Sequence, residues 1–162
     1  MERRVVEDNL PRLEMTDLIL RVRKFTHKPL RARQGNIKCY PVDLALRNAV
    51  LKTWEDYKAD PRTMGLYAEN LVANELARWS EAIEVSYYRE KTTEVDFVVT
   101  HGGDRHLPIE VKYRPTGASR GGLRHFMRKY AVDFGVVITR ELDCSFADGI
   151  VCVPLRYFLL AE

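Results

Sequence analysis

Three acidic residues and one lysine have the types and spacing that could carry out chemistry: Glu69, Asp96, Glu110 and Lys112. Thirteen residues separate Asp96 from Glu110, and Lys112 follows Glu110 by two positions, which places both on one face of a strand. Two carboxylates that lie close together repel each other, so at neutral pH they need a cation or a proton between them. Lys112 supplies part of that charge, and a divalent metal ion is expected to supply the rest.

A β-hairpin over residues 93–113 is expected to bring these groups together. Two runs of alternating residues flank Gly-Gly-Asp at 102–104, which is the sequence signal for a hairpin turn. In the first run, alternation predicts that Glu94, Asp96 and Val98 share one face of the strand. A solvated hairpin would show the same alternation without any function, but the acidic residues and a lysine at one end of the pair favour a site.

A helix from Asp60-Pro61 to about residue 80 is expected to position Glu69. Aspartate at the cap and proline in the first helical position are a strong start signal. Glu69 falls within an apolar stripe, and a carboxylate that faces the core is costly unless it is paired or bound to metal. The stripe is predicted to consist of Leu66, Val72, Ala73 and Leu76. Two interpretations stay open: Glu69 reaches water or an arginine at the edge of the stripe, or it points across the sheet toward Asp96.

The remaining elements predict an α/β fold. We expect strands at about 18–23, 37–42, 83–89, 134–139 and 149–153, and helices at about 44–52, 119–130 and 154–160. A hairpin beside a strand–helix–strand crossover implies a mixed central β-sheet flanked by helices. We expect residues 1–35 to form a strand-rich N-terminal appendage or linker, and residues 36–162 to form the main domain.

Composition and the cysteines exclude several classes of protein. With 46% hydrophobic and 30% charged residues among 162, the chain is predicted to be globular. It has no apolar run near the ~20 residues of a membrane span, and its first residues lack the apolar core of a signal peptide, so we expect a cytoplasmic protein without membrane contact. Cys39, Cys144 and Cys152 lack a metal-binding spacing and are expected to be reduced structural thiols.

Basic residues suggest contact with nucleic acid, although most basic clusters are simply solvated surface. The formal net charge is only +3, but lysines and arginines crowd residues 21–38 and 114–129. Such clusters attract a phosphate backbone. The candidate nucleic-acid contacts are Arg89, Lys91, Arg114, Arg120 and Arg124.

The helical Glu69, the strand residue Asp96 and the run Glu110-Val111-Lys112 together resemble the PD-(D/E)XK nuclease superfamily. Val95 stands where the founding motif has proline, a position that is often substituted. The resemblance implies a restriction-endonuclease-like core that binds Mg²⁺ (or Mn²⁺). The implied metal ligands are Asp96, Glu110, the carbonyl of Val111 and Glu69, and Lys112 would orient a water or stabilise the phosphate.

Several blocks in fixed order extend this resemblance: 38–49, 65–76, 87–89, 94–99, 108–113, 135–139 and 153–159. They are similar to the uncharacterised C-terminal domain of archaeal and bacterial AAA-type ATPases, over roughly residues 36–160. In that family an ATPase module and a winged-helix segment precede the domain, and residues 17–42 resemble the end of such a segment. The sequence contains no Gly-x-x-x-x-Gly-Lys-Ser/Thr loop, so we do not expect this chain to hydrolyse ATP by itself.

Two kinds of function follow as hypotheses. The first is a Mg²⁺-dependent nuclease domain that hydrolyses DNA phosphodiester bonds, with an ATPase module as partner in a longer chain or in trans. The second is a non-catalytic DNA-binding, protein-binding or regulatory module of the ATPase that keeps a nuclease fold. A homodimer stays open because two-fold dimers are the commonest assembly.

Overall fold

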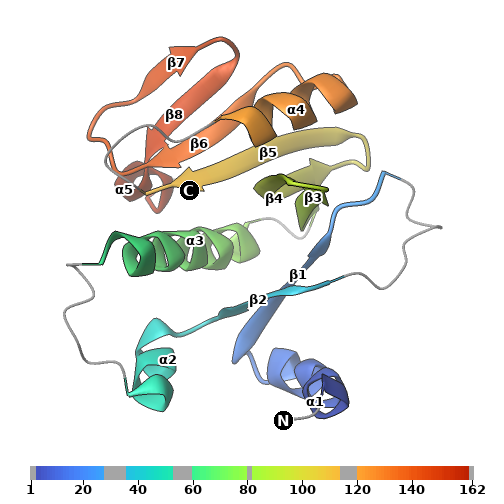
Figure 1. The fold of residues 1–162 in the computed structure, drawn as a ribbon, viewed down its shortest axis with the longest axis vertical. Coiled ribbons are helices and arrows are strands. Elements are labelled where there is room, and N and C mark those ends of the chain that lie inside the picture. Colours follow the sequence, from blue (N-terminus) through green and yellow to red (C-terminus); the bar gives the residue numbers. More distant parts are fainter. Residues whose placement is uncertain (1–2, 28–35, 53–59, 80–81, 114–119, 161–162) are drawn as a thin grey trace.

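A computed structural model describes residues 3–27, 36–52, 60–79, 82–113 and 120–160. These residues form one mixed sheet with helices around it (Figure 1). The helices are α1 (Arg3–Met15), α2 (Leu44–Leu51), α3 (Pro61–Arg78), α4 (Gly121–Tyr130) and α5 (Leu155–Phe158). The strands are β1 (Ile19–Lys24), β2 (Lys38–Pro41), β3 (Ile83–Glu90), β4 (Thr93–His101), β5 (Arg105–Lys112), β6 (Gly135–Thr139), β7 (Ser145–Ala147) and β8 (Ile150–Pro154).

The sheet confirms the predicted α/β class. In the described part of the chain its order is β2-β1-β3-β4-β5-β6-β8-β7. Strands β3, β4 and β5 are antiparallel neighbours, because the short turns between them reverse the chain. Strand β6 runs parallel to β5, and the helix α4 provides the crossover that a parallel pair requires.

The helix that carries Glu69 begins where the sequence predicts. The Asp60 carboxylate accepts hydrogen bonds from the backbone N–H groups of Arg62 (3.0 Å) and Thr63 (3.1 Å), and Pro61 occupies the first turn. This cap satisfies donors that the first helical turn leaves without partners. The predicted cap of α2 is also present, since Asp43 accepts from the N–H of Ala45 at 2.6 Å.

Two apolar clusters cover the two faces of the sheet, as the alternation along β6 shows. Ile138 packs in the cluster that includes Val72 and Leu76 of α3. Its neighbour Val137 packs in the other cluster, with Leu123 and Phe126 of α4. Successive strand residues point to opposite faces, so α3 and α4 lie on opposite sides of the sheet (Figure 1).

A β-bulge in β4 changes the predicted facing of its residues. Ser86 pairs with Val98 and Tyr88 pairs with Val95, so Asp96 and Phe97 together lie opposite one residue of β3. Such a bulge places one extra residue on a strand and breaks its alternation. Val98 therefore packs with Val95 in the α4 cluster, and the prediction that it shares a face with Asp96 is wrong.

Other differences concern the N-terminal part and the edges. Residues 3–15 form the helix α1, although they show no clear apolar period, and β7 was not predicted. Leu66 is 54% exposed and does not belong to the buried stripe of α3. Strand β1 pairs with β3 in parallel, so the N-terminal segment adds strands to the same sheet as the main domain. None of the described helices has the length and apolar character to cross a membrane.

Candidate functional site

Asp96 lies where β4 and β5 separate. Their described pairing runs from the hairpin turn to Phe97 opposite Ile109. Beyond it, the Val111 N–H donates to Asp96 Oδ2 at 2.8 Å, so the carboxylate takes the place of a backbone acceptor. The side chain of Asp96 is 15% exposed. This bond fixes Asp96 directly beside the segment that carries Glu110 and Lys112.

Glu110 is the most buried carboxylate of the site. Its Oε1 is bonded to Lys112 Nζ, while its Oε2 is buried and has no hydrogen-bond partner among the described residues. Burial, together with the nearby charge of Asp96, raises the pKa of Glu110 to about 7 in spite of Lys112. Near neutral pH this carboxyl group therefore has the capacity for a proton or a cation at its free oxygen.

Glu69 projects from α3 toward the same region. Its Oε1 accepts from Tyr40 OH at 2.6 Å and from Lys38 Nζ at 3.0 Å. Lys38 Nζ also lies 3.7 Å from Asp96 Oδ1. Glu69 is thus paired with Lys38, and Asp96 lies beside the same lysine.

Lys38 and Glu94 belong to the site, although the sequence did not select them. Lys38 Nζ lies 2.8 Å from Glu94 Oε1, and Arg89 Nε donates to Glu94 Oε2 at 2.8 Å. Glu94 could have been found, because alternation places it on the face of Asp96. Lys38 gave no such signal, since its contacts join β2 to residues far along the chain. We call Glu69, Glu94, Asp96 and Glu110, with Lys38 and Lys112, the acidic cluster.

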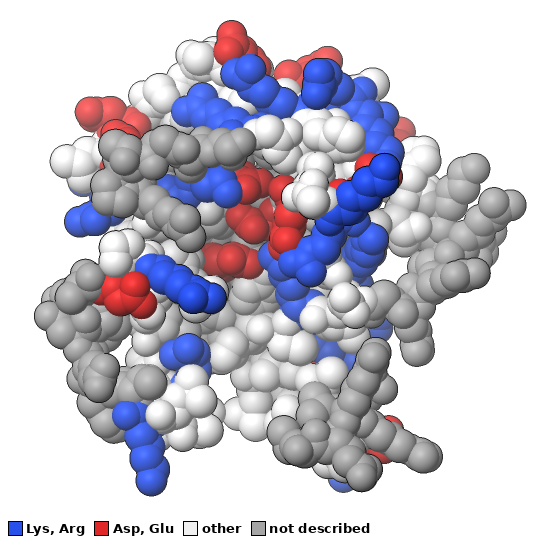
Figure 2. Space-filling view, in the orientation of Figure 1, with Lys and Arg blue, Asp and Glu red and all other residues white. Residues whose placement is uncertain are grey.

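The pKa shifts in the acidic cluster have two causes, which are burial and the charges of neighbouring groups. Burial raises the pKa of Asp96, and the charge of Glu69 raises it further. Burial lowers the pKa of Lys38, but Asp96 and Glu69 outweigh burial and the net shift is upward. The pKa of Tyr40 is raised by burial and by Glu69, so its hydroxyl stays protonated and donates. Figure 2 shows acidic side chains gathered near the centre of one face, with basic ones around them.

The donor set fits Mg²⁺ better than a metal that needs a full protein cage. In the described segments, no three His, Cys, Asp or Glu side chains are grouped as ligands of one metal. Mg²⁺ usually needs only one or two carboxylates, because waters and substrate phosphates complete its shell. Asp96 and Glu110 supply two carboxylates, and Glu110 Oε2, which has no hydrogen-bond partner among the described residues, is available as a metal ligand. Glu69 is already bonded to Lys38 and Tyr40.

The predicted nucleic-acid contacts fall in different places. Arg89 contacts the acidic cluster through Glu94, and Lys91 is exposed in the turn between β3 and β4. Arg120 donates to the buried Cys152 Sγ at 3.2 Å. Arg124 lies on the exposed side of α4, and Arg114 lies outside the described residues.

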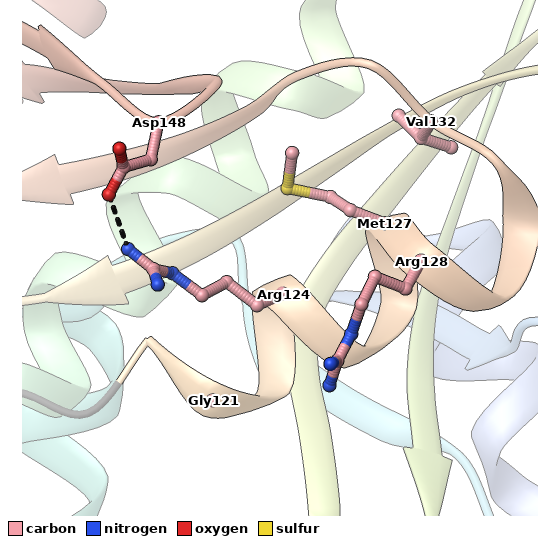
Figure 3. Close-up of a pocket in the computed structure, with 6 residues that line it drawn as sticks. All are labelled: Gly121, Arg124, Met127, Arg128, Val132 and Asp148. Carbon is pink, nitrogen blue, oxygen red and sulfur yellow. Dashed lines mark hydrogen bonds and ion pairs between the residues drawn. The ribbon is translucent and has the colours of Figure 1, made fainter.

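A pocket beside α4 is separate from this site (Figure 3). In it, Arg124 pairs with Asp148 at 2.9 Å, and both side chains are more than half exposed. The lining residues are Gly121, Arg124, Met127, Arg128, Val132 and Asp148. The pocket includes none of the acidic-cluster residues. The ion pair of Arg124 is therefore not part of the candidate site.

Comparison with known families decides where the chain belongs. A model described as Domain of unknown function (DUF4143) matches residues 64–158. The chain belongs to the DUF4143 family. DUF4143 is found as a C-terminal domain of AAA-type ATPases, which confirms that part of the resemblance. The match covers Glu69 and the whole β4–β5 hairpin, whereas Lys38 precedes it. Comparisons with curated proteins and with solved structures gave no match.

Proposed function

We propose that this DUF4143 domain is a metal-dependent nuclease that hydrolyses DNA phosphodiester bonds. The observation that carries the proposal is the hydrogen bond from the Val111 N–H to Asp96, which holds one carboxylate beside Glu110 and Lys112. The raised pKa of Glu110, about 7, supports it, because this carboxyl group is buried beside Asp96 and its Oε2 has no hydrogen-bond partner among the described residues. The proposal assigns α3, the β3–β4–β5 strands and the α4 crossover to a PD-(D/E)XK core.

The contacts of the residues, or the resemblance to the PD-(D/E)XK superfamily, suggest a role for each of them. Asp96 and Glu110 would hold Mg²⁺ or Mn²⁺, with Glu69 and the Val111 carbonyl as further ligands. When bound, the ion supplies positive charge that acidifies a water and offsets charge on the phosphate. Lys112 is 28% exposed beside Glu110, so its ammonium can contact a phosphate oxygen or orient the attacking water. Lys91 is exposed in the turn between β3 and β4 and would contact the DNA backbone.

One observation favours a second function. Lys38 already contacts three carboxylates, Glu69, Glu94 and Asp96, in the way that a structural ion-pair network would. A domain held together by such a network has no need of metal. This favours a non-catalytic module that binds DNA or a protein, or regulates the ATPase module to which such domains are joined. For either function we propose that the chain acts in the cytoplasm, with an ATPase module as its partner.

The decisive experiment measures DNA cleavage with Mg²⁺ or Mn²⁺ for wild type, Asp96→Asn and Lys112→Met. Loss of one charge-stabilising group typically lowers the rate by ~10²–10³-fold, so both variants should show almost no cleavage. Lys129→Met removes an exposed lysine of α4 outside the acidic cluster and should cleave like wild type. Thermal unfolding of each variant separates loss of chemistry from loss of fold.

Two results would reject the nuclease. Equal residual cleavage in Asp96→Asn and wild type would assign the activity to a contaminant. Absence of Mg²⁺ and Mn²⁺ binding at millimolar concentration, measured by calorimetry, would leave only the non-catalytic module. DNA retention that falls steeply with salt would then indicate a DNA-binding role, and absence of DNA retention would leave a protein-binding or regulatory role.

A further inference from the structure

The ammonium group of Lys38 occupies the position where the acidic cluster most needs a cation. It lies 2.8 Å from Glu94, 3.0 Å from Glu69 and 3.7 Å from Asp96, and its side chain is 20% exposed. Three carboxylates of two different elements, α3 and β4, therefore share one lysine from β2. An ammonium group carries one positive charge and donates in three directions, which suits this position.

A second cation at Asp96 would meet strong repulsion from this lysine. Two like charges a few ångströms apart repel each other, and the repulsion is stronger at the effective dielectric constant near a protein surface than in bulk water. A divalent ion held by Asp96 would share this carboxylate with Lys38, whose Nζ lies 3.7 Å from Asp96 Oδ1. Lys38 and the metal therefore compete for the same carboxylate.

The side chain of Lys38 can leave without moving the sheet. A lysine ammonium sits on a flexible four-carbon stem, whereas the Asp96 carboxylate is fixed by the Val111 N–H. The backbone of β2 is held independently, since Leu20 to Val22 of β1 pair with Tyr40 to Lys38. Asn74 of α3 also donates to the Val42 carbonyl at 2.9 Å.

We propose that Lys38 is a tethered cation that occupies the acidic cluster and must leave Asp96 before a divalent ion binds there. This inference rests on the proposed function, since it concerns the same metal site. It makes Lys38 a regulator of metal affinity, and it assigns no step of hydrolysis to this residue. Divalent ions are then expected to bind weakly until Lys38 is drawn away, and a DNA phosphate is an anion that would draw it.

The test measures Mn²⁺ binding to the full chain by calorimetry without DNA. Lys38→Met keeps the length of the side chain and removes its charge, so its Kd for Mn²⁺ should fall by about tenfold or more. The matched control is Lys129→Met, which removes a lysine bonded to Glu90, a carboxylate outside the acidic cluster. Its Kd should equal that of wild type.

Wild-type protein provides a second measurement that does not depend on the folding of a variant. Reductive methylation followed by peptide mass spectrometry reports how accessible each lysine is. Saturating Mg²⁺ should increase the modification of Lys38 severalfold and leave Lys129 unchanged.

The outcomes separate this inference from the nuclease proposal. If wild type and Lys38→Met bind Mn²⁺ with equal affinity, the metal site stands and the role of Lys38 is rejected. The same conclusion follows if Lys38→Met binds more weakly, or if methylation of Lys38 is unchanged by bound Mg²⁺. If neither protein binds Mn²⁺ at millimolar concentration, both proposals are rejected. Tighter Mn²⁺ binding by Lys38→Met, with no change in Lys129→Met, supports the proposed role of Lys38.

Discussion

Two glutamates of this domain are each bonded to a lysine, yet their pKa values move in opposite directions. Glu90 accepts from Lys129 Nζ (2.6 Å) and Tyr88 OH (2.6 Å), and it also lies 3.3 Å from His125 Nε2. The bond to Lys129 is the largest contribution, and the pKa of Glu90 falls to about 2. Glu110, bonded to Lys112, has a pKa of about 7.

Exposure and neighbouring charge account for the difference between these glutamates. The side chain of Glu90 is 44% exposed, whereas that of Glu110 is 9% exposed. Burial disfavours the ionised form of Glu110, and Asp96 adds a second negative charge nearby. A lysine contact therefore does not by itself satisfy a carboxylate. The group around Glu90 is a completed surface network, whereas the acidic cluster still accepts positive charge.

The largest expected effect is on the pH dependence of stability in Glu110→Gln. The pKa of Glu110 is raised from 4.5 in the unfolded chain to about 7 in the folded one, so the folded state holds this proton more tightly. The contribution of Glu110 to wild-type stability should fall as pH rises from about 4.5 to 7, and the penalty should persist above pH 7. Glu110→Gln should remove that fall and be more stable by about 2–3 kcal/mol at pH 8 in metal-free buffer.

Urea unfolding of both proteins at pH 5 and pH 8, with a chelator present, measures this difference. Glu90→Gln is the control, because its pKa lies far below both pH values. If stability depends on pH in the same way in wild type and Glu110→Gln, the pKa of Glu110 is not raised by folding and the prediction is wrong.

Alanine substitutions at two glycines, Gly122 and Gly65, test how closely α4 packs on the acidic cluster. A Cβ on Gly122 would overlap the carbonyl oxygen of Glu94, so the first turn of α4 packs directly on the backbone of the acidic cluster. Gly122→Ala should therefore destabilise the domain by about 1–3 kcal/mol. Gly65→Ala is the matched control within α3, where a Cβ meets no atom within 4 Å. It should stabilise the domain by about 0.5–1 kcal/mol, because glycine is unfavourable inside a helix.

Thermal unfolding of the two variants distinguishes packing from helix propensity. If both Gly122→Ala and Gly65→Ala stabilise the domain, helix propensity outweighs packing, and α4 is not in close contact with the Glu94 backbone. Such a result would also weaken the view that α4 positions the acidic cluster.

The smallest expected effect is at Glu90. Because its pKa is lowered, this group contributes stability above the unfolded pKa, and the contribution is lost as pH falls toward about 2. Exposed ion pairs contribute little, so Glu90→Gln should lower Tm at pH 7 by no more than about 2 °C. Calorimetric scans at pH 7 measure it. A larger drop would mean that the surface network is as important for stability as the acidic cluster.

Local signals in the sequence were enough to predict most of the fold. Asp60-Pro61 marked the start of α3, and Gly102-Gly103, both with positive φ, marked the turn of the hairpin. The apolar run at 134–139 predicted a strand, which β6 confirms over Gly135–Thr139, although Phe134 is 51% exposed. The helix α1 was missed because most of its residues are polar and Pro11 lies within it.

The site was predicted less completely, since its partners come from distant parts of the chain. Asp96, Glu110 and Lys112 follow from one hairpin, so their approach to one another could be expected. The bulge at Asp96 and Phe97 has no local signal, because it depends on the register with β3. Lys38 looked like one member of a basic segment until the β1–β2 pair was placed beside β3.

The position of β1 sets a practical limit on truncation. The family match begins at residue 64, but β1 pairs with the outer side of β3 through Arg23 opposite Ser86 and Lys24 opposite Tyr87. A recombinant fragment cut at that boundary would leave β3 with an open edge, which is a template for intermolecular strand pairing. It would also strip Glu69 of both its donors, Lys38 and Tyr40. Expression trials should therefore start upstream of Ile19, or insoluble protein will be mistaken for an inactive domain.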